Sequence, residues 1–177
     1  MRTPTRPVGA KPPLLFISYS HEDDECRKQM RIHLKPLERG QVLRVFDDTE
    51  LMRDTGWRGQ LIKKLNEAEI VVMLVSAEFL ASSFCFVEEW PIARRRWKAG
   101  KAIVTFALIS PCQWKHEDIG TLQGVPTHGL LLPDNKREAA HFWDKIMDKL
   151  REDAKKRRPK ASKKKAKAVK KSPKRKP

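Results

Sequence analysis

Short, continuous runs of apolar residues recur along the chain, separated by longer polar or amphipathic stretches. The clearest runs are LLFIS at 14–18, EIVVMLVS at 69–76 and AIVTFALIS at 102–110, and shorter ones occupy 42–46 and 129–132. A strand that is buried on both faces of a sheet has this pattern, because neither of its faces meets water. The runs therefore predict a central sheet of about five strands.

The stretches between these runs have the spacing of helices that bury one face. Helices are predicted at 21–40, 57–68, 83–98 and 135–153. Strands that alternate with helices form a parallel sheet covered on both faces, so the predicted fold class is α/β with three layers. Ligands of such folds bind outside the carboxyl ends of the strands. We therefore expect a site near 18–22, 46–51 and the residues from Ser76 onward.

Charge divides the chain into a near-neutral body and a basic end. Residues 155–177 hold 14 Lys or Arg and no acid, whereas the first 154 residues hold 24 basic and 22 acidic residues. A segment of this composition cannot bury a core, so we expect a disordered tail at 154–177 after a domain at 14–153. The Pro-rich residues 1–13 are expected to be a disordered arm. The tail should attract polyanions, such as nucleic acid or an anionic surface, without sequence specificity.

No targeting or membrane signal is recognisable. The first 13 residues lack the apolar core of a secretory signal, and the longest apolar run, at 70–75, is too short to span a bilayer. The three cysteines form no CxxC pair, which is typical of reduced thiols. We therefore expect a cytoplasmic protein without a transmembrane segment.

Several common catalytic motifs are missing. The sequence has no P-loop, no GxGxxG and no GxSxG. Its five histidines and three cysteines do not have the spacing of metal ligands, so we expect neither a metal nor a cofactor. A response-regulator receiver is excluded too, because its phospho-acceptor Asp would stand where this chain has Val75 and Ser76.

Two adjacent carboxylates, Glu88 and Glu89, interrupt an otherwise apolar segment at 84–93. A carboxylate that faces a packed interior is costly unless it is paired, hydrogen-bonded or protonated. Either both side chains face solvent and balance the arginines at 94–96, or one of them lines a site.

The order of several stretches resembles Toll/interleukin-1 receptor (TIR) domains of the bacterial type. The resemblance covers roughly residues 14–150 and rests on LLFISYSHEDDE at 14–25, on the segment from VFDD to SSFC at 45–85, and on ISPCQWKHEDIGTLQGVP at 109–126. It implies a flavodoxin-like fold. For many bacterial and plant members it also implies cleavage of the nicotinamide–ribose bond of NAD+, which is then a substrate and not a cofactor.

The essential residue of these enzymes is a glutamate early in the helix after the central strand. Counting from the SSFC turn matches it to Glu88, whereas the pattern Glu-apolar-x-x-Ala matches it to Glu89. On a helical projection from Phe84, Glu89 falls near 140°, inside the apolar arc of about 80–240°, and Glu88 near 40°, at its edge. Glu89 is therefore our candidate catalytic residue and Glu88 the alternative, with Pro91 able to distort the helix.

The resemblance also points to a set of substrate-binding candidates around the crevice. They are Ser18, Tyr19, Ser20, Asp47, Asp48 and Trp57. Tyr19 and Trp57 offer ring faces to a base, and the two aspartates offer carboxylates to ribose hydroxyls. The structural alternatives are a core position for Trp57 and turn or cap roles for the aspartates.

Partners follow from the same resemblance. It implies self-association, or contact with other TIR domains, through the loop at 47–56. A non-catalytic interaction module built on that loop is the alternative to an enzyme. In a third hypothesis, the basic tail tethers the domain to nucleic acid.

Overall fold

The computed structural model describes residues 11–50, 55–122 and 131–157. Its centre is a sheet of four parallel strands in the order β2-β1-β3-β4. The strands are β1 (Leu14–Ser18), β2 (Arg44–Phe46), β3 (Ile70–Val75) and β4 (Ile103–Leu108). The chain moves from β1 to one side for β2 and then to the other side for β3, so the strand order reverses between β1 and β3.

The described residues also form five α-helices and several shorter helical segments. The α-helices are α1 (Asp24–Arg39), α2 (Trp57–Glu67), α3 (Ala77–Ala81), α4 (Trp90–Lys98) and α5 (Lys136–Arg157). The shorter segments are η1 (His21–Asp23), η2 (Asp48–Glu50), the π-helix η3 (Ser83–Glu89), η4 (Trp114–His116) and η5 (Asp118–Thr121).

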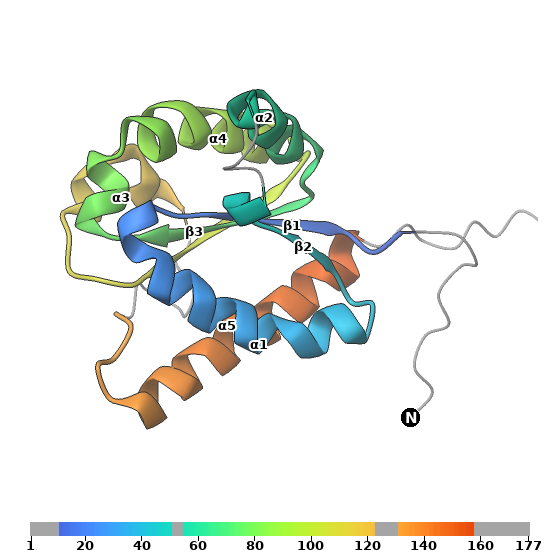
Figure 1. Ribbon diagram of the computed structural model, residues 1–177, viewed down its shortest axis with the longest axis vertical. Coiled ribbons are helices and arrows are strands. Elements are labelled where there is room, and N and C mark those ends of the chain that lie inside the picture. Colours follow the sequence, from blue (N-terminus) through green and yellow to red (C-terminus); the bar gives the residue numbers. More distant parts are fainter. Residues whose placement is uncertain (1–10, 51–54, 123–130, 158–177) are drawn as a thin grey trace, which may run out of the picture.

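Helices cover both faces of the sheet, which confirms the α/β flavodoxin-like fold class. Figure 1 shows α1 and α5 on one face and α2 and α4 on the other. Successive residues of a strand point to opposite faces. In β1, Leu15 and Ile17 accordingly join the core under α1 and α5, whereas Phe16 joins the core under α2 and α4.

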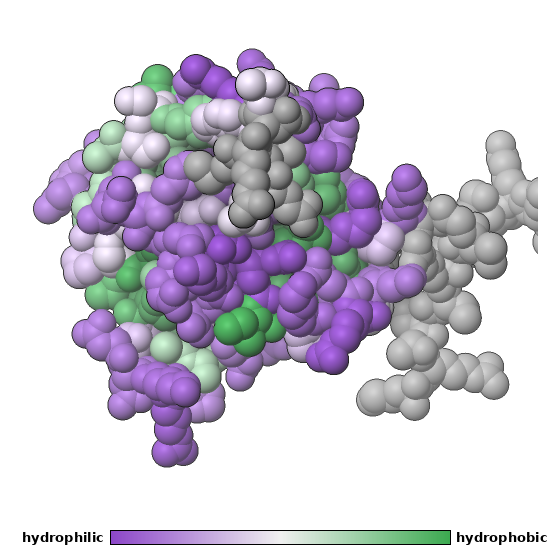
Figure 2. All heavy atoms as spheres, in the orientation of Figure 1, coloured by the Kyte–Doolittle hydropathy of each residue, from purple (hydrophilic) through white to green (hydrophobic). Residues whose placement is uncertain are grey.

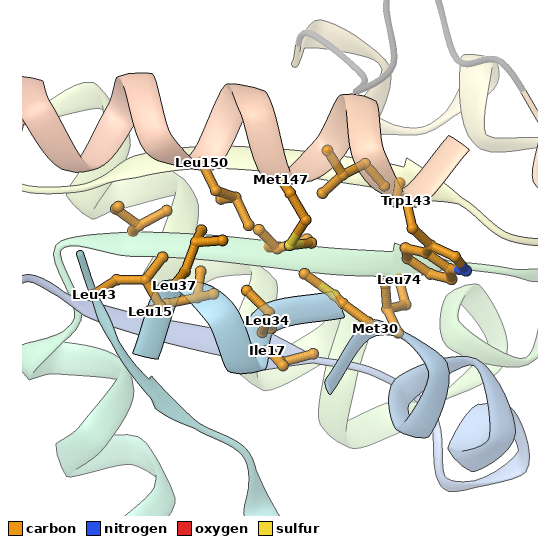
Figure 3. Close-up of a cluster of buried hydrophobic side chains, with 14 of the residues drawn as sticks. Leu15, Ile17, Met30, Leu34, Leu37, Leu43, Leu74, Trp143, Met147 and Leu150 are labelled. Carbon is orange, nitrogen blue, oxygen red and sulfur yellow. The ribbon is translucent and has the colours of Figure 1, made fainter. Parts of the chain in front are cut away.

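The core under α1 and α5 is a continuous layer of aliphatic and aromatic side chains. In Figure 3, Leu34 and Leu37 from α1 and Met147 and Leu150 from α5 converge on the one face of the sheet that both helices cover. The periodicity of these residues along their helices is the one read from the sequence, because a helix repeats its face every three to four residues.

Half of the predicted fifth strand, residues 129–130, lies outside the described residues. Among the described residues, the run at 129–132 is represented by Leu131, which forms an isolated parallel bridge with Leu108 of β4. The amide of Leu132 donates to the carbonyl of Leu108 at 2.9 Å. The chain therefore passes alongside the outer edge of β4, where a fifth strand would lie.

Two helix boundaries differ from those expected. The segment at 83–98 divides into η3 and α4, and α3 precedes it. Helix α5 continues to Arg157, although we placed the start of the tail at 154. It continues because Ala154 is fully buried against the core and Arg157 donates to the carbonyl of Gly100 at 3.0 Å. Residues 1–10 of the arm and 158–177 of the tail lie outside the described residues.

The surface seen in Figure 2 is mainly hydrophilic, with hydrophobic groups in small separate areas. Within the described ranges, no helix has the length and apolar character needed to cross a membrane.

Candidate active site at the carboxyl end of the sheet

A pocket of about 670 Å³ opens beyond the carboxyl ends of β1 and β3, where the strand order reverses. This is where ligands bind in open α/β sheets, and the volume suits a small molecule. Its lining comes from β1 and η1, from Asp48, from α2, and from the segment after β3. The lining residues are Ile17, Tyr19, Ser20, His21, Glu22, Asp48, Trp57, Leu61, Glu78, Ala81, Ser82, Phe84, Cys85 and Glu89.

Glu89 is the buried carboxylate of this pocket. It is 3% exposed, and its Oε2 accepts a hydrogen bond from the hydroxyl of Ser18, the last residue of β1. Burial raises the pKa of Glu89 to about 8, against the opposing effect of the Ser18 hydrogen bond, with smaller upward contributions from Asp48 and Glu88. The pocket wall thus holds a carboxyl group that releases its proton near neutral pH.

The local backbone explains why Glu89 faces inward. The hydroxyl of Ser82 accepts from the amide of Cys85 and caps η3, whose wide turns run into the first turn of α4. Pro91 lacks an N–H and its ring crowds the preceding turn, which disfavours an ordinary α-helix here. The wider π turn absorbs this conflict, while Trp90 and Ala93 of α4 stay buried on the face that Glu89 shares.

Glu88 lies on the other side of the same segment. Its side chain is 30% exposed and forms a two-pronged ion pair with Arg58 of α2, in which Arg58 Nε donates to Oε2 at 2.9 Å. It does not line the pocket. The geometry therefore separates the two acids into a pocket carboxylate and a surface ion pair.

Asp48 joins two other residues of the pocket wall. The hydroxyl of Tyr19 donates to its Oδ1 at 2.6 Å, and a ring nitrogen of His21 hydrogen-bonds its Oδ2 at 2.7 Å. Asp48 is 7% exposed, so these two bonds hold a nearly buried carboxylate. Burial, followed by the hydrogen bond to Asp48, raises the pKa of Tyr19, so the phenol remains the donor.

The remaining candidates divide between the pocket and elsewhere. Ser20 and Trp57 line the pocket, and Trp57 packs on Phe84 with the ring centroids 5.1 Å apart. Asp47 points away from it. Its Oδ2 lies 3.3 Å from Arg31 Nε and 3.6 Å from Arg27 Nη1, so it anchors α1 instead of facing a ligand.

Sequence reasoning placed a site in the regions that contain His21, Glu22, Glu78 and Cys85 but did not single out these four residues. Cys85 precedes Glu89 by one helical turn, and its thiol donates to the carbonyl of Tyr19 at 3.1 Å. Burial raises the pKa of Cys85 to about 12, so this thiol is a structural donor and a poor nucleophile. The position of Cys85 on the face of Glu89 was a usable signal, whereas the His21–Asp48 pair depends on contacts distant in sequence.

The comparison with known families agrees with this architecture. A family model described as the TIR domain matches residues 15–152. The chain belongs to the TIR-domain family. This TIR domain accounts for the four described strands and for the pocket beyond their carboxyl ends.

A curated relative extends the comparison to a bacterium. The uncharacterized protein y4lF of Sinorhizobium fredii (strain NBRC 101917 / NGR234) is 33% identical to the chain over 117 residues. The match covers 66% of this chain but only 36% of y4lF, so the aligned region is about a third of that longer protein.

Replacing Tyr19 with phenylalanine tests the Asp48 network. The change leaves Asp48 Oδ1 without its phenol donor, and an unsatisfied buried acceptor costs about 1–3 kcal/mol. We expect the free energy of unfolding to fall by about that amount in urea titrations. In a double-mutant cycle with Asp48→Asn the two losses should be non-additive, and fully additive losses would contradict the network.

Proposed function

We propose that this TIR domain cleaves the nicotinamide–ribose bond of NAD+, with Glu89 as the carboxylate that faces the reacting sugar. The observation that carries the proposal is a buried carboxyl group without a cationic partner. Among the described residues, no Lys or Arg lines the pocket around Glu89. The pyridinium ring of NAD+ brings a positive charge to such a wall, and that charge favours the ionised form of a neighbouring carboxylate.

The proposed chemistry needs only one carboxylate. When the bond between the ribose C1′ and the nicotinamide nitrogen breaks, both electrons go to the nitrogen and nicotinamide leaves as a neutral molecule. The ribose is left as an oxocarbenium-like cation, which an adjacent carboxylate stabilises. Water then adds to C1′ and loses a proton. No acid has to protonate the leaving group.

The neighbours of Glu89 have supporting roles in this proposal. Ser18 holds one carboxylate oxygen from the end of β1 and leaves the other available to the sugar. Trp57 and Phe84 form an aromatic wall, against which a flat nicotinamide ring packs. The Tyr19–Asp48–His21 network supplies polar atoms at the side of the pocket where ribose hydroxyls would lie.

The test is release of nicotinamide from NAD+ by the purified full chain, measured by chromatography over a range of protein concentrations. We expect release, with a rate per molecule that increases on a crowding support, because self-association is proposed to complete the site. Residues 51–54 of the predicted contact loop lie outside the described residues.

Glu88→Gln is the matched control, since it makes the same chemical change one residue away. It removes a surface ion pair, which is worth about 0–1 kcal/mol, and should retain the wild-type rate of release. Absence of release from the wild type under every assembly condition would overturn the proposal. It would favour the non-catalytic interaction module instead.

A further inference from the structure

The end of the sheet opposite the pocket carries a concentration of positive side chains. The C-terminal turns of α4 and α5 both end there, because α4 leads into the start of β4 and the last residue of α5 bonds to the turn between them. The cations of these turns are Arg95, Arg96, Lys98, Lys101, Lys155, Lys156 and Arg157. In Figure 1 the red end of α5 lies at the end of the sheet where β1 begins.

Hydrogen bonds of two arginines show that the C-terminal turns of α4 and α5 lie close to the loops at this end of the sheet. Arg157 Nη1 donates to the carbonyl of Gly100 at 3.0 Å, and Arg96 Nη2 donates to the carbonyl of Ala68 at 2.6 Å. Burial and then the positive charge of Arg157 lower the pKa of Arg96. The Nε of Arg96 is buried and has no hydrogen-bond partner among the described residues. Like charges therefore converge here, and Asp153, which pairs with Lys149 and Lys156, compensates them only in part.

Elsewhere in the described chain, paired and unpaired cations are mixed, and unpaired ones such as Lys63, Lys115 and Lys136 lie on separate elements. On α1, Arg27, Lys28, Arg31 and Lys35 each lie within 4 Å of an acidic side chain. Among the cations of the C-terminal turns of α4 and α5, Lys156 pairs with the buried Asp153. Arg95, Arg96, Lys98, Lys101, Lys155 and Arg157 have no ion pair with any acid in the described part of the chain. These six residues are called the basic end below.

We infer that the basic end is a binding surface for the phosphate backbone of a nucleic-acid duplex. Unpaired cations grouped on one surface are the electrostatic footprint of backbone binding, which gains free energy by releasing counterions from the duplex. The chain leaves the described structure at Arg157, inside this surface, and 11 of the next 20 residues are Lys or Arg. The folded surface is thus followed directly in the sequence by a stretch rich in Lys and Arg.

Two features favour a duplex over the other polyanions. Single strands are held by aromatic side chains on which the bases stack, and no large aromatic side chain is exposed among the described residues. Stable membrane binding needs a hydrophobic insertion in addition to a basic patch. The exposed large apolar residues of the described chain are Ile32, Val87 and Leu131, and none belongs to the turns that form the basic end.

The test compares two triple variants of the full chain that both lose three exposed lysines and keep residues 158–177. The surface variant is Lys98→Gln/Lys101→Gln/Lys155→Gln. The control variant is Lys115→Gln/Lys136→Gln/Lys145→Gln, whose positions lie in η4 and the first half of α5. Binding of a fluorescent DNA duplex of mixed sequence is measured by anisotropy between about 50 and 200 mM salt.

Each lost phosphate contact should reduce the slope of log K against log salt concentration by about 1. We expect the surface variant to lose a slope of about 3 and the control variant less than 1, with unchanged melting temperatures for both. Equal slopes for the two variants would overturn the proposal and assign binding to residues 158–177 alone. Tighter binding of a single strand, or of anionic phosphatidylserine vesicles, would also overturn it.

Discussion

Glu89→Gln is expected to reduce the rate of nicotinamide release by at least about a hundredfold, the loss typical for removing one group that stabilises charge in a transition state. Glutamine keeps the shape of the side chain and can still accept the hydrogen bond that Ser18 donates. It removes only the negative charge that the proposed oxocarbenium-like sugar requires. The rate is measured at saturating NAD+ beside the wild type and Glu88→Gln.

The same substitution should stabilise the folded protein. A folded-state pKa of about 8 for Glu89 lies above the value of about 4.3 in an unfolded chain. The folded form therefore binds this proton more tightly, and the stability that Glu89 contributes is complete below about pH 4 and lost as the pH rises to about 8. Glutamine does not titrate, so its advantage over the wild type should be about 3 kcal/mol at pH 7.

Urea unfolding of both proteins at several pH values measures this advantage. All other titrating groups are shared, so the difference between the two proteins isolates Glu89. It should increase by about 3 kcal/mol between pH 5 and pH 8. A pH-independent difference would show that Glu89 titrates normally in the folded protein. Retention of nicotinamide release by Glu89→Gln would separately remove Glu89 from the proposed chemistry.

The pH dependence of catalysis is the second large effect. In the free protein Glu89 must lose a proton with a pKa of about 8 before it can stabilise a cation. We expect kcat/KM to rise nearly tenfold per pH unit from pH 6 to about pH 8 and then to level off. Bound NAD+ brings its pyridinium charge beside the carboxyl group, which lowers the pKa of that group. The corresponding rise in kcat should therefore occur at lower pH than the rise in kcat/KM.

Steady-state rates between about pH 5.5 and 9.5, corrected for the breakdown of NAD+ without protein, give both profiles. Glu88→Gln serves as the control and should reproduce the wild-type curves. A kcat/KM that is flat from pH 6 to 9, or that falls as the pH rises, would contradict a buried carboxylate as the group that must ionise.

The sequence predicts the layers of this fold well because each layer follows from the pattern of apolar and polar residues within a single strand or helix. Continuous apolar runs located β1, β3 and β4, and the spacing of apolar residues between them located helices that bury one face. The inward direction of Glu89 was also predictable, since it precedes the buried Trp90 and lies one turn before Ala93.

The rest of the site depends on contacts that no local pattern records. Asp47 and Asp48 are equivalent in sequence, yet only Asp48 meets Tyr19 and His21. Asp47 turns to α1 because Arg27 and Arg31 present their guanidinium groups there. The division of 83–98 into two helical types reflects a compromise between Pro91 and the packing of α4, and an ideal helical projection assumes that no such compromise exists.

The π-helix also bears on how insertions and deletions can act at this site. A π turn holds one more residue than an α turn, so η3 can be viewed as an α-helix with one residue inserted. Val87 is 66% exposed, so its side chain contributes little to the core. Its deletion would leave Glu89 attached to α4 while rotating Phe84 and Cys85 by about 100° relative to it. Deletion of one residue would thus change the position of Phe84 in the aromatic wall of the pocket and leave the Glu89 carboxylate in place.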